Sequence, residues 1–155
     1  MSIALTRIDE RLIHGQVAYS WSVAYQVDEI VVVDDVLVHD EMQRMLLEMA
    51  VPEGKKFQLL SVEEASNYFK SENKLNTFLV VKGPQTILDL VNQGVHFEEI
   101  NVGGMYFKED KIEITKTVYL NEEEKMIFRD LASKNIYLDV RTAPSDKSID
   151  LISRI

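Results

Sequence analysis

The stretch TFLVVKGPQTILDLVNQ, residues 77–93, indicates the fold class of this chain. Its first five residues, 77–81, are apolar or β-branched and predict a buried strand. Residues 85–93 carry apolar side chains at the spacing of a helix, and Lys82, Gly83 and Pro84 form the short connection between the two. The stretch is therefore one strand, loop and helix unit.

The same alternation runs along the whole chain. The last predicted helix begins at Asn121, whose side chain can cap the backbone, and three glutamates follow in its first turn. Strands are predicted at residues 3–6, 29–33, 56–60, 77–81, 99–102 and 135–140, and helices at 17–25, 40–49, 62–69, 85–93 and 121–133.

Residues 106–120 break this alternation. Residues 111–116 alternate polar and apolar side chains without a preceding helix, which predicts a half-exposed edge strand or hairpin. Strands that alternate with helices form parallel sheets through right-handed crossovers. We therefore expect an α/β fold: a doubly wound, mostly parallel open sheet with helices on both faces and one antiparallel edge strand or hairpin. No linker or repeat divides residues 1–155, so we expect one domain.

Composition excludes several classes of protein. The chain has 155 residues, of which 46% are hydrophobic and 28% charged, so it is too apolar to be disordered. Its formal net charge of −9 argues against a nucleic-acid partner and against general binding to anionic membranes. It has no cysteine, which excludes disulfides and thiolate chemistry and is compatible with a reducing compartment.

No apolar run approaches the roughly 20 residues that a membrane span requires, and the N-terminus does not have the pattern of a signal peptide. We therefore expect a cytoplasmic protein. Metal-binding spacings such as HxH and HExxH are absent, so we expect no metal and no cofactor.

The densest group of polar residues lies at residues 7–17, which read RIDERLIHGQV. An imidazole at His14 is a nucleophile near neutral pH, and the guanidinium groups of Arg7 and Arg11 complement a phosphoryl dianion. Gly15 permits close approach of the backbone, and the start of the following helix favours anions. The alternative is a solvated network of ion pairs between these arginines and neighbouring carboxylates.

Other positions are weaker candidates. Asp34 and Asp35 follow the second strand, and either carboxylate could orient the His14 imidazole if the first two strands are neighbours. Capping of a turn or helix is the alternative for both. His39 and His96 are expected to be structural.

Apolar side chains at helical spacing are expected to pack. Trp21 and Tyr25 are four residues apart, which is typical of packing on one helix face. A second apolar stripe at helical spacing is also expected in the core. It consists of Met42, Met45, Leu46 and Met49.

Two consecutive glycines, Gly103 and Gly104, follow the fifth predicted strand. They permit close approach of the backbone at that point.

Several of these segments together resemble one family. Residues 7–17, Trp21, residues 33–35 with Asp40, residues 50–54 and the stretch NVGGM at 101–105 are similar to the IIB component of the mannose/fructose/sorbose family of bacterial sugar phosphotransferase systems. The resemblance covers essentially the whole chain, and the RLIHGQV stretch is highly specific to that family. Two departures are Glu10, where relatives often carry Asp or Asn, and the APSD turn at 143–146.

The resemblance implies a phosphoryl relay. A phosphohistidine of a IIA protein would donate to Nδ1 of His14, which would then phosphorylate a sugar carried by the membrane components IIC and IID. In this scheme Arg11 steadies the phosphoryl group, Arg7, Gly15 and Gln16 also bind it, and Asp9, Asp34 and Asp35 support the site. The chain would be a protein-histidine–sugar phosphotransferase that associates transiently with the inner face of the membrane.

Two other functions are compatible with the same residues. One is a regulatory binding module that signals through its phosphorylation state, and the other is an α/β enzyme in which His14 acts as a general base for a small anion. The sequence leaves the sugar open among mannose, fructose, sorbose and amino sugars such as N-acetylgalactosamine. It also leaves open whether the chain forms homo-oligomers.

Overall fold

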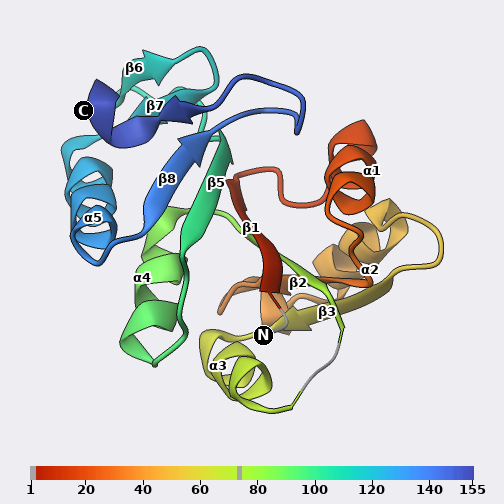
Figure 1. Ribbon diagram of the computed structural model, residues 1–155. Helices are drawn as coiled ribbons and strands as arrows, with labels where there is room; N and C mark the ends of the chain where they lie inside the picture. The colour runs from red at the N-terminus through yellow and green to blue at the C-terminus, as the bar shows by residue number, and fades with distance from the viewer. Residues whose placement is uncertain (1–2, 73–74) are drawn as a thin grey trace.

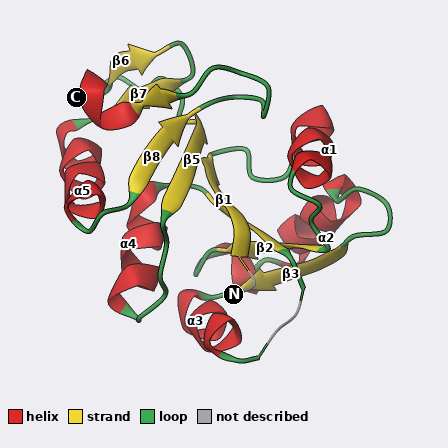
Figure 2. Ribbon diagram, viewed as in Figure 1, coloured by secondary structure: helices red, strands yellow, loops and turns green. Residues whose placement is uncertain are grey.

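The computed structural model describes residues 3–72 and 75–155, which form one sheet with helices on both of its faces, together with a small hairpin (Figure 1). The elements alternate along the chain as the sequence predicted (Figure 2). The strands of the main sheet are β1 (Ile3–Asp9), β2 (Glu29–Val33), β3 (Lys56–Leu60), β4 (Thr77–Val81), β5 (Glu99–Gly104), β8 (Tyr137–Val140) and β9 (Ile149–Asp150). The helices are α1 (Gly15–Ala24), η1 (Leu37–His39), α2 (Glu41–Ala50), α3 (Val62–Lys70), α4 (Pro84–Asn92), α5 (Glu122–Ser133) and η2 (Leu151–Arg154).

The strand order of the main sheet is β3-β2-β4-β1-β5-β8-β9. Neighbouring strands are parallel except β8 and β9, which pair antiparallel at the edge. The sheet is therefore mostly parallel and doubly wound, as expected. One expectation was wrong: β1 lies between β4 and β5, so the first two strands are not neighbours.

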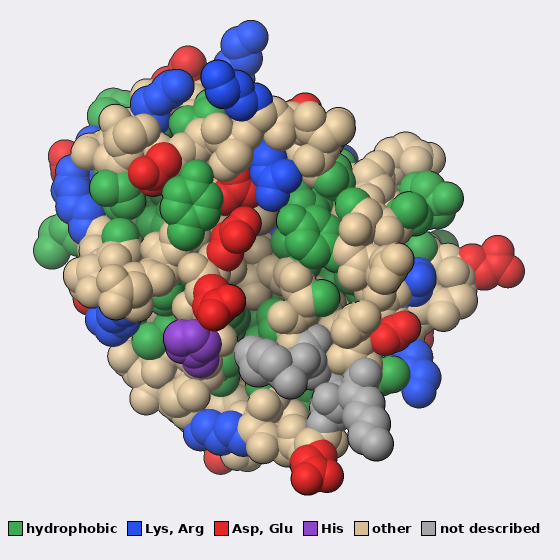
Figure 3. Space-filling model, in the orientation of Figure 1, with side chains coloured by type: hydrophobic (Ala, Val, Ile, Leu, Met, Phe, Trp, Pro, Cys, Tyr) green, Lys and Arg blue, Asp and Glu red, His purple; other side chains and the backbone are tan. Residues whose placement is uncertain are grey.

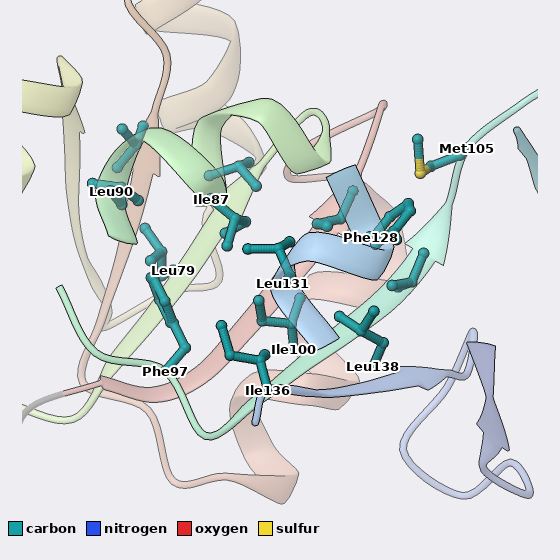
Figure 4. Packing of buried hydrophobic residues seen from close by; sticks show 14 of the residues in the cluster. Leu79, Ile87, Leu90, Phe97, Ile100, Met105, Phe128, Leu131, Ile136 and Leu138 are labelled. Atoms are coloured by element: carbon teal, nitrogen blue, oxygen red, sulfur yellow. The ribbon is translucent and has the colours of Figure 1, made fainter. Parts of the chain in front are cut away.

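Two apolar cores cover the two faces of the sheet. α1 and α2 contribute Trp21 and Leu47 to one core, and α3, α4 and α5 contribute side chains such as Leu90 and Phe128 to the other. Figure 4 shows this second core, where Leu131 from α5 and Ile87 from α4 pack against strand residues. Burial on both faces explains why the central strands read as continuous apolar runs.

Residues 106–120 form a hairpin, as the sequence allowed. β6 (Ile112–Thr115) and β7 (Val118–Leu120) pair antiparallel in a sheet of their own, and a bridge between Met105 and Val118 connects them to the end of β5. Asn121 caps α5 through its side chain, with Glu124 completing a capping box, which confirms the predicted helix start.

The predicted methionine stripe is not part of the core. Met42, Met45, Leu46 and Met49 all lie exposed on α2, and Leu47 is the buried residue of that helix. The expectation was wrong because helical spacing identifies a face but not its direction: the side that carries Leu47 packs on the sheet, and the methionine side faces solvent.

Candidate functional site

The site lies where β1 ends and α1 begins. β1 extends to Asp9, three residues beyond the predicted strand, so Arg7 and Asp9 lie on the same face of a strand and not in a loop. Each of their side chains is only 1% exposed, and they form an ion pair of 3.0 Å between Arg7 Nη2 and Asp9 Oδ2. A buried charge needs such a partner, and here each residue supplies it for the other.

The Arg7 guanidinium is held from several elements at once. Its Nη1 donates to Asn101 Oδ1 on β5 over 2.6 Å and to the carbonyl oxygens of Arg141 and Thr142 after β8. Burial lowers the pKa of Arg7 from its usual value, while the charge and hydrogen bond of Asp9 act in the opposite sense. Arg7 is therefore buried and holds Asp9 in place through their ion pair. The sequence had suggested that Arg7 contacts phosphate.

Asp9 joins the ion pair to His14. The same Oδ2 lies 3.0 Å from Nε2 of His14, and Oδ1 accepts the backbone N–H of Arg11 over 2.9 Å. A carboxylate paired with arginine can only accept hydrogen bonds, so Nε2 is the donor in this contact when the imidazole is neutral. The other ring nitrogen, Nδ1, then keeps its lone pair.

The surface of the site contains the other predicted residues. His14 is the N-cap residue of α1, and its side chain is 16% exposed. Arg11, Gly15 and Gln16 are exposed beside it. Gly15 has a φ of 45°, the left-handed conformation that glycine adopts most readily. The first backbone N–H groups of a helix have no intrahelical partner, so the start of α1 offers donors to an anion.

The two glycines at the end of β5 make room for the site. A Cβ on Gly103 would overlap the Arg7 guanidinium. A Cβ on Gly104 would lie 2.6 Å from the Tyr106 hydroxyl and 3.1 Å from Asp9 Oδ1. The close approach that the sequence suggested here is therefore an approach of side chains from β1 and from the loop after β5.

Trp21 links α1 to the loop after β8. Two guanidinium groups lie over its ring, with Arg7 Cζ 5.3 Å and Arg141 Cζ 5.1 Å from the centroid, and its Nε1 donates to the carbonyl of Thr142. It also stacks on Tyr25, which confirms the predicted packing of that pair. Arg141 is fixed in turn by Asp139 over 2.8 Å.

Asp34 and Asp35 do not orient His14. Oδ1 of Asp34 accepts the backbone N–H groups of Val36 and Leu37, and Oδ1 of Asp35 accepts that of Val62 at the start of α3. Because β4 lies between β1 and β2, these carboxylates serve local turn and helix capping. Asp9, five residues before His14, is the carboxylate that binds the imidazole.

Sequence reasoning assigned no role in the site to Asn101, Arg141 or Tyr106. A polar residue within the apolar run of β5 was the available signal for Asn101, because a buried amide needs partners. His39 and His96 are both exposed, and His96 precedes β5, near the amino ends of the parallel strands, whereas His14 follows the carboxyl end of β1. Figure 3 shows acidic side chains near the middle of the face seen in Figure 1, with a histidine below and to the left of them.

Within residues 3–72 and 75–155, no three His, Cys, Asp or Glu side chains are grouped to hold a metal ion. No helix of this described part has both the length and the apolar character needed to cross a membrane. The site therefore consists of an imidazole, its carboxylate, an exposed guanidinium and a helix start, an arrangement suited to a phosphoryl anion.

Comparison with known proteins agrees with this fold. Residues 3–155 match the family described as PTS system sorbose subfamily IIB component, and the chain belongs to that family. It is 35% identical to the sorbose-specific EIIB component of Lacticaseibacillus casei, over 100% of this chain and 96% of that protein.

Two further relatives are informative. The chain is 34% identical to the mannose-specific EIIAB component of Escherichia coli strain K12. The match covers all of this chain and 50% of that protein. The crystal structure of the IIBSor domain of the sorbose permease from Klebsiella pneumoniae superposes with a TM-score of 0.95 and 35% identity, covering 99% of this chain and 96% of that one. The chain is thus a IIB component of the sorbose and mannose type of sugar phosphotransferase system.

Proposed function

We propose that this chain is a histidine phosphocarrier that accepts a phosphoryl group on Nδ1 of His14 and passes it to a sugar. The observation that carries the proposal is the 3.0 Å contact between Nε2 of His14 and Asp9, which leaves Nδ1 as the free nucleophile. Family membership supports the same reaction class.

The donor is a phosphohistidine on a IIA partner. The Nδ1 lone pair attacks phosphorus, the donor's P–N bond breaks, and the donor imidazole leaves with the electron pair. A sugar hydroxyl then attacks the new phosphohistidine, so that the P–N bond of His14 breaks and the hydroxyl proton is released. Such transfers depend on positioning and charge stabilisation and require no further group from this chain.

The residues around His14 have separate roles in this reaction. Arg11 is exposed and supplies positive charge to the equatorial oxygens, together with N–H groups at the start of α1, where Gly15 and Gln16 lie. Asp9 holds the imidazole and offsets the positive charge that develops on it during transfer. Arg7 keeps Asp9 in place from below.

The partners follow from the same proposal. The mannose-specific relative named EIIAB is about twice the length of the matched region, which is consistent with a IIA unit acting beside a IIB unit. Sugar acceptance takes place with membrane components IIC and IID, so the chain works at the inner face of the membrane.

The test is incubation of the purified chain with phosphorylated IIA at neutral pH, followed by intact-mass spectrometry. We expect one added phosphoryl group on the wild type, lost on acidification, and none on His14→Ala. His96→Ala is the matched control, because this exposed histidine lies near the amino ends of the strands, away from His14, and its loss should leave labelling intact. Labelling of His14→Ala, or of neither protein by a donor that phosphorylates its own known acceptor, would refute the proposal.

Removal of Arg11 tests the role of its charge. Arg11→Ala should slow single-turnover transfer by about 10²-fold, the loss typical of removing one preorganised donor. The thermal midpoint should change little because the side chain is exposed. Arg129→Ala removes an exposed arginine on α5 and should transfer at the wild-type rate, and equal rates for both variants would contradict the role of Arg11.

A further inference from the structure

Tyr106 lies folded back over the end of β5, against the site. Its hydroxyl oxygen and Cζ would be 2.6 Å and 2.9 Å from a Cβ on Gly104, and Asp9 Oδ1 would be 3.1 Å from the same point. The ring therefore occupies space that any other residue at position 104 would fill. The Tyr106 hydroxyl and the Asp9 carboxylate consequently lie beside each other.

The backbone on either side of Gly104 is tied to the loop after β1. The Glu10 N–H donates to the Gly104 carbonyl over 2.9 Å, and the Tyr106 N–H donates to Glu10 Oε1 over 3.1 Å. Glu10 also lies 3.7 Å from Lys111, which is buried and paired with Glu124. The position of Tyr106 is thus fixed relative to the segment that carries Arg11 and His14.

The surroundings of the Tyr106 hydroxyl contain both signs of charge. Burial and the Asp9 carboxylate raise its pKa, while the charge of Arg11 and a hydrogen bond with that side chain act in the opposite direction. The raised pKa keeps the phenol protonated at neutral pH. A neutral phenol can accept a hydrogen bond from a guanidinium and donate one to an anion.

The Arg11 side chain is exposed. The hydrogen bond between Arg11 and Asp9 comes from the backbone N–H of Arg11, so it does not hold the guanidinium group. A hydroxyl partner such as Tyr106 would hold that group. A free arginine side chain samples many rotamers, and ordering it costs conformational entropy. A residue that holds the guanidinium before the phosphoryl group arrives removes part of that cost from the transfer step.

We propose that Tyr106 is a positioning residue of the phosphoryl site: its hydroxyl holds Arg11 beside the Asp9 carboxylate, ready for the phosphoryl group on His14. The inference rests on the proposed function, since it assigns Tyr106 a role only through Arg11. Tyr106 itself is 37% exposed, so its side chain is partly accessible from the surface.

The test is the variant Tyr106→Phe, which keeps the ring over Gly104 and removes the hydroxyl. In single-turnover transfer from phosphorylated IIA, we expect the maximal rate to fall about three- to tenfold, as for the loss of one hydrogen bond. The donor concentration at half-maximal rate should stay unchanged. The Arg11 Nε–H resonance should be sharp in wild-type NMR spectra and broadened in the variant.

A double-mutant cycle decides whether the hydroxyl acts through Arg11. In the Arg11→Ala background, Tyr106→Phe should have no additional effect on the rate, because the group it positions is gone. Tyr119→Phe is the matched control, since its hydroxyl bonds Glu113 on the hairpin and its ring contacts Phe107. It should leave the rate at the wild-type value.

The outcomes separate this inference from the proposed function. If the wild type accepts no phosphoryl group on His14, the function itself fails. If the wild type is labelled and Tyr106→Phe transfers at an equal rate, the role of Tyr106 fails while the function stands. An equal loss in both Arg11 backgrounds, or an effect on donor affinity alone, would also overturn the positioning role.

Discussion

At the scale of single residues, the site depends on how tightly the Arg7 guanidinium is packed. Its donors go to Asp9, Asn101 and two backbone carbonyls, and its face lies on Trp21. Although an arginine side chain is flexible in isolation, this one cannot move without breaking a buried ion pair. Gly103, the residue of β5 that faces this guanidinium group, therefore has to be small.

Gly103→Ala tests this packing. The added methyl group would overlap the Arg7 guanidinium, so we expect a loss of about 1–3 kcal/mol in the free energy of unfolding, measured by urea denaturation. The control is Gly83→Ser at the N-cap of α4, where an added Cβ meets no atom within 4 Å and serine caps well. If both variants unfold at the same urea concentration, the packing argument is wrong.

At the scale of elements, the sequence predicted the position of α2 correctly but the wrong face of this helix as the buried one. Its predicted range of 40–49 agrees closely with Glu41–Ala50, and Asp40 caps it through the N–H of Gln43. Leu47 is 7% exposed and Met49 is 80% exposed, so the two side chains differ greatly in the surface they bury. The stability of the helix should depend on Leu47.

The expected result is that Leu47→Ala costs about 2–4 kcal/mol of unfolding free energy, as large-to-small substitutions in cores do. Met49→Ala, four-fifths exposed on the same helix, should change it by less than about 0.5 kcal/mol. Chemical denaturation of both variants checks this pair. A larger loss for Met49→Ala would mean that the exposed face of α2 contributes to folding.

The start of α3 is sensitive to pH. Ser61 and Glu64 form a capping box, and hydrogen bonds from the backbone and side chain of Ser61 hold the pKa of Glu64 below its usual value of 4.5. Because the folded pKa is the lower one, the stabilisation is present above pH 4.5 and is lost as the pH falls through the folded value.

Glu64→Gln should therefore be less stable than the wild type at neutral pH, and the difference should shrink as the pH is lowered below 4.5. Thermal unfolding followed by circular dichroism between pH 7 and about pH 3 measures the two curves. Glu63→Gln, in the same first turn but outside the box, should show no such convergence, and a gap that widens in acid would contradict the assignment.

At the scale of the whole molecule, local patterns predicted the elements and long-range contacts decided the site. The strands at residues 29–33, 56–60 and 77–81 were predicted with the observed bounds, because a buried strand is visible in its own side chains. Strand order is not local information. The position of β4 between β1 and β2 is what separates Asp35 from His14.

The same distinction applies to the functional residues. His14, Arg11 and Asp9 lie within six positions of one another, so their proximity could be predicted. The partners of Arg7 lie 94 residues away at Asn101 and further still in the loop after β8, and no spacing rule connects them. This is why Arg7 was assigned to phosphate binding, although it is buried in a non-local network.

The arrangement of strands predicts where the chain opens last. β1 and β4 are central and buried, whereas β9 has two residues and only β8 beside it. Hydrogen exchange followed by NMR should find the amides of β1 and β4 slower than those of β9 by at least about 100-fold. Equal protection across the sheet would mean that it opens only as one unit.

Trp21 gives this protein an optical signal next to the network that holds His14. It is the one tryptophan in the sequence, it is fully buried, and guanidinium groups of Arg7 and Arg141 lie on its ring. Indole emission responds to nearby charge. Intrinsic fluorescence therefore reports from the layer directly beneath His14 without any label, and arrival or departure of a charged group can be followed in real time in the unmodified chain.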